Sequence, residues 1–186
     1  MKIQGVSPLL MHSALLNDPM AEITKALKKI NAKRKKVDAD LEEMSKLEFY
    51  GGIYVDKEGY PILPSTCLEA CIVEGAKAEK LGKKFKATVF VDGDPRLIYD
   101  GPKDVDGLWE AGTFRDTRRV KVGMSGVMRT RPRFDEWALS FPILYVSSAV
   151  TVENVESALV TAGQMVGLCD FRPRFGRFQV VDFKPQ

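Results

Sequence analysis

The hydrophobic period changes several times along this 186-residue chain, and this alternation limits the folds that the chain can adopt. Between residues 19 and 47, apolar residues recur at steps of three, four or seven, which predicts an amphipathic helix with a break near Asn31. A later helix is expected to begin after Thr151, whose hydroxyl would cap it, and to end near Gly167. Segments with the two-residue period of strands surround these helices. The pattern therefore favours an α+β fold.

Strands and turns account for most of the remaining chain. Thr66 and Glu69 have the spacing of a capping box, so a further helix is expected there. A β-hairpin is expected from residues 50–55 and 60–63, around a turn that contains Gly59. The other segments expected to be extended are 2–6, 85–91, 97–99, 118–122, 127–134, 137–146 and 178–183. This order suits an antiparallel sheet with helices on one face.

A chain of this length fits one domain and can bury enough surface to fold without disulfides or a structural metal. We expect residues 1–186 to form a single domain, in which residues 19–63 are an inserted helical arm and β-hairpin. The apolar faces of the strongest strands and helices supply the expected core, which consists of Ile3, Val89, Leu139, Ile143, Val155, Leu159 and Val180.

The cysteines and the histidine do not form a recognisable metal or disulfide pattern. Cys67, Cys71 and Cys169 make an odd number, and the first two share one face of a predicted helix. The single histidine, His12, is distant in sequence and cannot complete a zinc motif by spacing. We therefore expect buried free thiols, and neither a metal nor a cofactor.

The sequence contains no nucleotide-binding loop, dinucleotide fingerprint or nucleophile elbow. His12 lacks an acid, serine or cysteine partner in a matching motif, so we expect a protein without enzymatic activity. A metal-independent ribonuclease that uses His12 as its general base is the weakest of the alternatives.

The first residues lack the long apolar stretch and the cleavage site of a secretory signal. No apolar run reaches the roughly 18 residues that would indicate a membrane span. We therefore expect a cytoplasmic protein of a bacterial or phage-infected cell, with no membrane partner.

The net charge of +3 is too small to identify a partner, but basic residues are concentrated in three segments. The first segment is in the arm and contains Lys33, Arg34 and Lys35. Two interpretations stay open for it. The lysines and arginine could contact phosphates, or they could be balanced by the acidic residues that follow at 38–43.

The second segment contains Arg118, Arg119, Arg129, Arg131 and Arg133, and Asp116 is the single acid between residues 115 and 133. The last three arginines would project from one face of an extended strand because side chains alternate. Neighbouring guanidinium groups repel one another unless anions meet them. Protein carboxylates could do so, but the shortage of nearby acids favours a polyanion.

The third segment is a loop in which Arg172, Arg174 and Arg177 alternate with Phe171 and Phe175. Arginine can contact a phosphate or stack on a base, and phenylalanine offers a base a flat ring. A loop of this composition could also be a protein interface. We expect it to bind nucleic acid.

The chain resembles the RAMP superfamily, which comprises ferredoxin-like, RRM-related proteins and includes the backbone subunits of CRISPR effector complexes. Residues 3–11 resemble the first strand of that superfamily and its Gly-x-x-Pro-Leu turn. Residues 61–70 resemble the segment in which a Pro-x-Ser/Thr turn leads into the first core helix. Residues 167–178 lie where the superfamily has a glycine-rich loop, although here only Gly167 and Gly176 are glycines. The chain is also similar in general shape to uncharacterised bacteriophage proteins.

This resemblance implies a ferredoxin-like sheet, an RNA-binding or single-strand-binding surface and head-to-tail self-assembly. Together with the arginine segments, it predicts a non-enzymatic protein that binds single-stranded RNA or DNA and assembles along it as a homo-oligomer. The main alternative is a phage inhibitor or assembly protein whose basic loops dock on an acidic protein partner.

Overall fold

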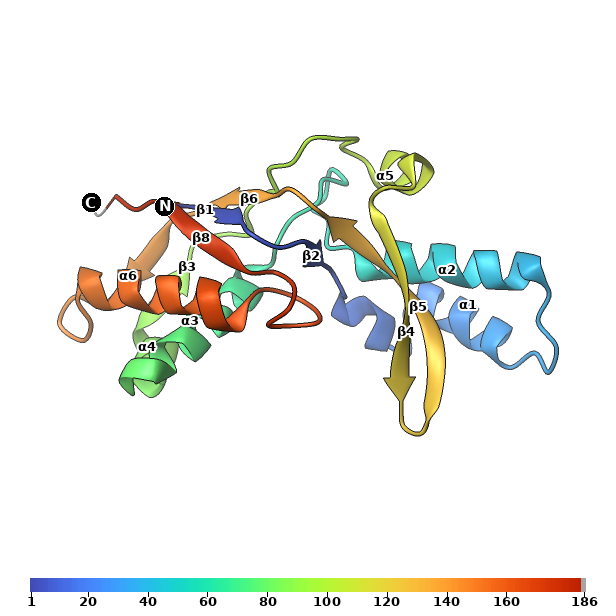
Figure 1. Cartoon of the computed structure of the whole chain (residues 1–186), viewed down its shortest axis with the longest axis horizontal. Coiled ribbons are helices and arrows are strands. Elements are labelled where there is room, and N and C mark those ends of the chain that lie inside the picture. The colour runs from blue at the N-terminus through green and yellow to red at the C-terminus, as the bar shows by residue number, and fades with distance from the viewer. Residues whose placement is uncertain (185–186) are drawn as a thin grey trace.

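The computed structural model describes residues 1–184, and within that range it contains six α-helices and eight β-strands. The α+β class expected from the sequence is therefore confirmed. Figure 1 shows an elongated molecule with both termini near one end and the helical arm at the other. No helix in residues 1–184 combines the length and the apolar character that a membrane crossing needs.

A three-stranded antiparallel sheet lies near the termini. Its central strand, β1 (Lys2–Gly5), pairs with β6 (Ala138–Ser140) on one side and with β8 (Phe178–Asp182) on the other. Helices α3 (Ser65–Ala76) and α6 (Val152–Thr161) pack against each other and cover one face of this sheet (Figure 1).

Glycines allow close packing around α3 and α6. A Cβ atom on Gly75 in α3 would lie 2.2 Å from the carbonyl oxygen of Ala158 in α6. After α6 the chain makes a π-helical turn (Ala162–Val166), in which a Cβ atom on Gly163 would lie 2.2 Å from the carbonyl oxygen of Phe178. A larger residue at either glycine would force these elements apart.

The opposite end of the molecule consists of a helical arm and a long β-hairpin (Figure 1). The arm contains the short 3-10 helix η1 (Ala14–Asn17), followed by α1 (Glu22–Asn31) and α2 (Asp38–Gly52). The hairpin pairs β4 (Arg115–Val122) with β5 (Ser125–Phe134). Helix α2 packs against β5, so the arm and the hairpin support each other.

The two ends are connected by a short strand, β2 (Leu9–Leu10), which follows β1 and pairs with β5. A separate two-stranded ladder joins β3 (Val89–Val91) and β7 (Ile143–Tyr145). The remaining elements and their bounds are η2 (Lys77–Glu79), α4 (Gly82–Thr88) and α5 (Val105–Ala111).

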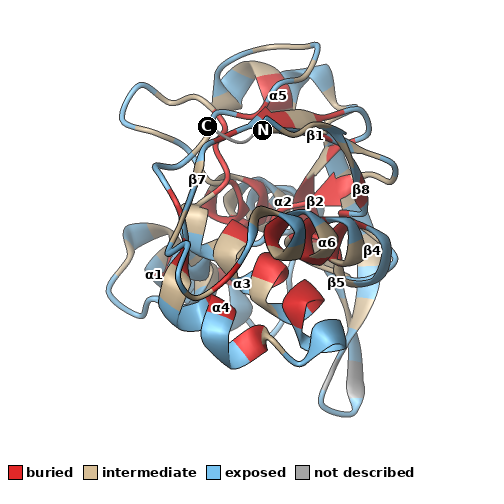
Figure 2. Ribbon diagram, turned by 90° about the vertical axis from the view of Figure 1, so that its left-hand side faces the viewer, coloured by how far each residue is buried: buried red, intermediate tan, exposed pale blue. Residues whose placement is uncertain are grey.

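One buried cluster extends from α3 and α6 to α2 and β5. Figure 2 shows the buried residues where the helices meet the strands, with exposed residues on the outer sides of the helices. Five members of the expected core are buried, namely Ile3, Val89, Leu139, Val155 and Leu159. The other two, Ile143 and Val180, are partly buried and pack against the cluster.

The break expected near Asn31 is confirmed, since α1 ends at that residue. The hairpin expected at 50–63 is wrong in its first strand, because residues 50–52 are the end of α2. Gly51 lets this last turn pack closely, and a Cβ atom there would lie 2.4 Å from Leu16. The rest of the expected hairpin is a turn with a single bridge between Val55 and Pro61.

Three other strand predictions need correction. Residues 85–88 belong to α4, where Phe85 is fully buried, and only 89–91 are extended. Residues 97–99 form only one bridge, between Ile98 and Ala138. Pro142 divides the expected strand 137–146 into β6 and β7, because proline has no N–H to donate to a continuous ladder.

The two expected helix caps have different outcomes. Thr151 caps α6 as expected, since its hydroxyl accepts a 3.3 Å hydrogen bond from the backbone N–H of Asn154. The capping box at Thr66 is wrong because α3 already begins at Ser65. Glu69 instead accepts a 2.9 Å hydrogen bond from the N–H of Val91 and connects α3 to β3.

The ferredoxin-like arrangement stays a prediction. The order β1, α3, β3, β6, α6, β8 contains the β-α-β-β-α-β succession of ferredoxin-like folds. In the described residues, however, β3 pairs with β7 and lies outside the sheet of β1.

Leu159 tests whether α6 packs on the sheet as described. Its side chain is 1% exposed, so Leu159→Ala should lower the free energy of unfolding by about 2–5 kcal/mol through lost burial and the cavity left behind. The neighbouring Val160 is 40% exposed, and Val160→Ala should cost about 0.5 kcal/mol or less. Urea denaturation followed by circular dichroism measures both, and equal losses would contradict the packing of this helix.

Candidate functional site

Two of the three basic segments meet in the structure. The loop of residues 167–177 lies against β2, where the backbone N–H of Asp170 donates to the carbonyl of Leu10 at 3.0 Å. The backbone N–H of Gly176 likewise donates to the carbonyl of Pro8 at 2.8 Å. The carboxylate of Asp170 accepts a hydrogen bond from Arg131 Nε in β5, which ties the loop to the hairpin.

The antiparallel register gathers the hairpin arginines on one face. Arg118 lies opposite Arg129, and Asp116 lies opposite Arg131. Residues that are directly opposite in a ladder share a face, as do residues two apart in one strand, so Arg133 belongs to the same face. We call this face and the adjoining loop the arginine surface, and its arginines are Arg118, Arg129, Arg131, Arg133, Arg172, Arg174 and Arg177.

Each hairpin arginine of this surface contacts a carboxylate. Arg129 Nη1 donates to Glu48 Oε1 at 2.6 Å, and Arg118 and Arg131 pair with Asp116 and Asp170. Arg133 contacts Asp116 at 3.2 Å and Asp135 at 2.6 Å. The expected shortage of nearby acids is therefore wrong, because the fold brings carboxylates from other elements to β5.

These ion pairs alter the titration of the acid between the strands. The Arg118 guanidinium hydrogen-bonds to Asp116 and holds the pKa of that carboxyl below its ordinary value. Arg133 adds to this effect through its own hydrogen bond. Asp116 therefore stays ionised at neutral pH and fixes both guanidinium groups in place.

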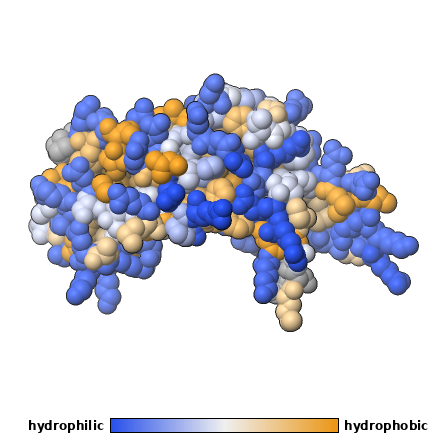
Figure 3. Space-filling view, in the orientation of Figure 1, coloured by the Kyte–Doolittle hydropathy of each residue, from blue (hydrophilic) through white to orange (hydrophobic). Residues whose placement is uncertain are grey.

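The loop arginines differ from the hairpin arginines. Arg172, Arg174 and Arg177 are exposed, and none of them forms an ion pair with another residue in the range 1–184. The arginine surface thus combines seven arginines with four contacting carboxylates, which leaves it positively charged. Figure 3 shows strongly hydrophilic atoms across the middle of the molecule, over the region of the loop and the hairpin.

Phe171 and Phe175 lie within the arginine surface and contact its guanidinium groups. Their rings form an edge-to-face pair with centroids 6.3 Å apart. The Arg118 guanidinium lies 4.5 Å from the centroid of Phe175, and that of Arg131 lies 5.1 Å from the centroid of Phe171. Such contacts contribute about 0.5–1 kcal/mol each and orient the arginines. The expected stacking of bases on these rings stays a prediction.

The other candidate residues lie elsewhere. Lys33, Arg34 and Lys35 are exposed in the connection between α1 and α2, at the far end of the arm (Figure 1). Lys33 Nζ contacts Asp40 at 2.5 Å, which agrees with the interpretation that the acidic residues at 38–43 balance the basic residues of the arm. Arg119 lies opposite Met128, on the reverse face of the hairpin. The structure does not bring these four residues to the arginine surface.

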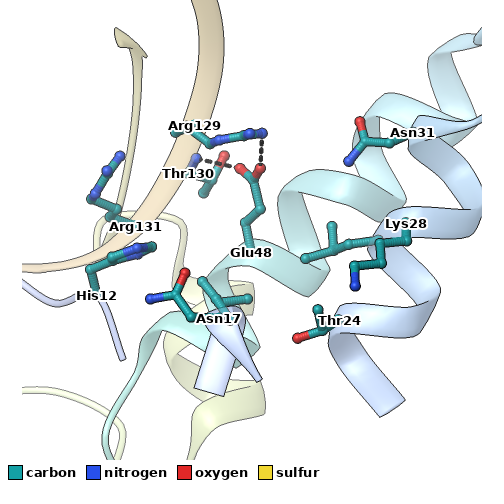
Figure 4. A pocket seen from close by; sticks show the side chains of 11 residues that line it. His12, Asn17, Thr24, Lys28, Asn31, Glu48, Arg129, Thr130 and Arg131 are labelled. Atoms are coloured by element: carbon teal, nitrogen blue, oxygen red, sulfur yellow. Dashed lines mark hydrogen bonds and ion pairs between the residues drawn. The ribbon is translucent and has the colours of Figure 1, made fainter. Parts of the chain in front are cut away.

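A pocket beside the arginine surface contains residues that sequence reasoning missed (Figure 4). They are Asn17, Asn31 and Glu48, and His12 and Lys28, both noted from the sequence, lie with them. Glu48 is 7% exposed and also accepts a 2.8 Å hydrogen bond from the backbone N–H of Thr130. Ser45 and Glu48 are three residues apart, so they share one face of α2, and both hydrogen-bond to Thr130 of β5. This spacing is the one sequence signal that could have indicated the contact.

His12 has an environment that disfavours its charged form. Partial burial lowers the pKa of His12 below the ordinary 6.5, and the charge of Arg131 lowers it further. Asp170 and Glu48 oppose this shift without reversing it. The imidazole is therefore neutral at neutral pH and can both donate and accept hydrogen bonds.

The cysteines and acids do not suggest a catalytic or metal centre. Cys67, Cys71 and Cys169 are free thiols, of which Cys71 is buried as expected while Cys67 and Cys169 are only partly buried. Burial raises the pKa of Cys71 to about 12. Thiols of this kind are poor nucleophiles. Within residues 1–184, no cluster of three or more His, Cys, Asp or Glu side chains is arranged to hold a metal ion.

Comparisons with known proteins do not assign the chain to a family. No protein-family model matches it, and no curated protein sequence matches it either. The resemblance to the RAMP superfamily therefore stays a prediction from the motifs.

The titration of His12 checks the electrostatics of the pocket. Because it is the only histidine, its imidazole signal in a proton NMR titration needs no further assignment, and its midpoint should lie below 6.5. Arg131→Gln removes a nearby positive charge and should raise the midpoint. Arg174→Gln removes an exposed charge and should leave it nearly unchanged. A midpoint at or above 6.5 in the unaltered protein would contradict the environment described.

Proposed function

We propose that the protein binds single-stranded nucleic acid, RNA or DNA, through the arginine surface and without catalysing a reaction. The observation that carries this proposal is the convergence of the hairpin and the 167–177 loop into one surface with an excess of arginines over carboxylates. Phosphate contacts supply most of the affinity in nucleic-acid binding that does not depend on sequence.

The paired and unpaired arginines serve different purposes in this proposal. A guanidinium group has several N–H donors, and a carboxylate on one side leaves others free for a ligand. The pairs at Arg118, Arg129, Arg131 and Arg133 hold these side chains in fixed positions, which lowers the entropy lost on binding. Arg172, Arg174 and Arg177 supply the charge that carboxylates do not offset.

The two aromatic rings of the arginine surface favour a single strand over a duplex. Single strands expose their bases, and planar guanidinium groups or aromatic rings can stack on them. Phe171 and Phe175 are partly exposed and lie among the arginines. The proposal also includes four predictions made from the sequence. These are a ferredoxin-like arrangement, self-assembly along the strand, a phage origin and a cytoplasmic location.

A second candidate is docking on an acidic protein, and the tip of the hairpin favours it. Met124 is fully exposed, and Met128 is 58% exposed on the same hairpin. Exposed methionines are frequent in adaptable protein interfaces. Both candidates use the basic surface, but only the first requires affinity for oligonucleotides.

Removal of the loop arginines should separate specific contacts from general charge. If all three contact phosphates, the triple change Arg172→Ala, Arg174→Ala and Arg177→Ala should make the slope of log affinity against log salt less negative by about 2, at about 0.7 per contact. Binding of labelled oligonucleotides, measured by fluorescence anisotropy between about 50 and 200 mM salt, gives this slope.

The matched control removes the same charge from elsewhere on the protein. Lys2, Lys57 and Lys84 are exposed and line no cleft that contains a loop arginine, so their replacement by alanine should change the slope by less than about 0.7. Equal slopes for the two triple variants would show that the loop has no special role. A folded, unaltered protein that ignores RNA and DNA oligonucleotides would overturn the proposal in favour of protein docking.

A further inference from the structure

The pocket beside the arginine surface has a volume of about 310 Å³ and lies between the arm and β5 (Figure 4). Helix α1 supplies one wall through Lys28 and Asn31, and His12 and Arg131 lie on the opposite side, with Glu48 between them. Arg129 and Arg131 belong both to this pocket and to the arginine surface. A ligand held on the surface could therefore extend into the pocket.

Several polar side chains of the pocket have no protein partner. His12, Asn17, Lys28 and Asn31 are exposed to solvent at the rim of the pocket, and within residues 1–184 their side chains make no hydrogen bond. Two amides, an imidazole and an ammonium group together offer both donors and acceptors. Polar groups that converge in this way on a concave site are typical of ligand recognition.

The charges of the pocket favour an anion. The single carboxylate, Glu48, is satisfied by Arg129 at 2.6 Å and by the backbone N–H of Thr130 at 2.8 Å. Lys28 has no carboxylate partner among the described residues. Arg131 adds little net charge because Asp170 pairs with it, but its buried Nη1 atom lacks a hydrogen-bond partner in the described part of the chain. The negative charge of Glu48 is thus offset, and the excess is positive.

The pocket also has an apolar part. Leu16 of η1 and Leu27 of α1 line it together with Thr24, whose hydroxyl donates to the carbonyl of Leu15. An apolar wall beside amide groups suits a nucleobase, whose faces are apolar and whose edge forms hydrogen bonds. The volume is near the lower end of ligand pockets, roughly 300–1,000 Å³, so it suits one nucleotide rather than several.

We propose that this pocket binds one nucleoside monophosphate unit, with its phosphate near Lys28, its base against Leu16 and Leu27, and the amides of Asn17 and Asn31 at the base edge. The ligand class rests on the proposed function. The unit can come from a free nucleotide or from the phosphorylated end of a strand on the arginine surface, since both present the same groups.

Calorimetric titration of the full chain with adenosine 5′-monophosphate and uridine 5′-monophosphate tests the proposal directly. Saturable binding by at least one of them is expected, with a change in the His12 imidazole signal in NMR spectra. Lys28→Ala should weaken it about tenfold or more, since a charge-assisted hydrogen bond is lost. Lys29→Ala is the matched control, because Lys29 is the next exposed lysine of α1 and does not line the pocket.

Two further ligands test which parts of the nucleotide are recognised. Adenosine and inorganic phosphate should each bind more weakly than the complete monophosphate. If inorganic phosphate binds as tightly as both nucleotides, the assignment of the base to Leu16 and Leu27 is overturned. Equal effects of Lys28→Ala and Lys29→Ala, or no binding of either nucleotide, would overturn the pocket as a whole.

Oligonucleotides with and without a 5′-phosphate identify the source of the unit. Tighter binding of the 5′-phosphorylated strand, lost in Lys28→Ala, supports a strand end, and equal binding together with saturable mononucleotide binding supports a free nucleotide. If the mononucleotides fail to bind but oligonucleotide affinity keeps its dependence on the loop arginines, only the pocket assignment falls. If neither kind of ligand binds, the proposed function falls with it.

Discussion

The arrangement of the arginine surface depends on Asp170. Its backbone N–H donates to the carbonyl of Leu10 in β2, and its carboxylate accepts from Arg131 in β5 and from the backbone N–H of Phe171. One residue therefore holds the 167–177 loop, a connecting strand and the hairpin together. Arg131 is 9% exposed, and burial of this charge is tolerable only because the carboxylate and the ring of Phe171 meet it.

Glu48 performs a similar task two residues away along β5. It fixes Arg129 and the backbone of Thr130 to α2, so the arm, the pocket and the arginine surface share one strand. The two carboxylates explain why a segment so rich in arginine folds at all, because neighbouring guanidinium groups repel one another without anions. The remaining positive charge is displaced to the loop, where solvent reaches Arg172, Arg174 and Arg177.

Local features of the sequence were sufficient for the α+β class, the break near Asn31, the cap at Thr151 and the two strands of the hairpin. They failed where a distant contact decides the outcome. Phe85 is helical because α4 buries it, and Pro142 sends the two halves of one apolar run to different partners. The candidate arginines were identifiable from composition. Their carboxylates were not, because Glu48 and Asp170 are separated from Arg129 and Arg131 by 81 and 39 residues.

The backbone of the loop before β8 is much more constrained than its side chains. Gly176 has a φ angle of +71°, and a Cβ atom there would lie 2.0 Å from the carbonyl oxygen of Leu168, so no other residue fits. The side chains of the exposed arginines on either side of Gly176 are not held by close backbone contacts of this kind. These arginines can therefore be replaced by other residues, in evolution or by design, while Gly176 maintains the backbone conformation of the loop. Because the backbone of the loop is fixed while its side chains are free to vary, related proteins can bind different ligands at this loop without a change of fold.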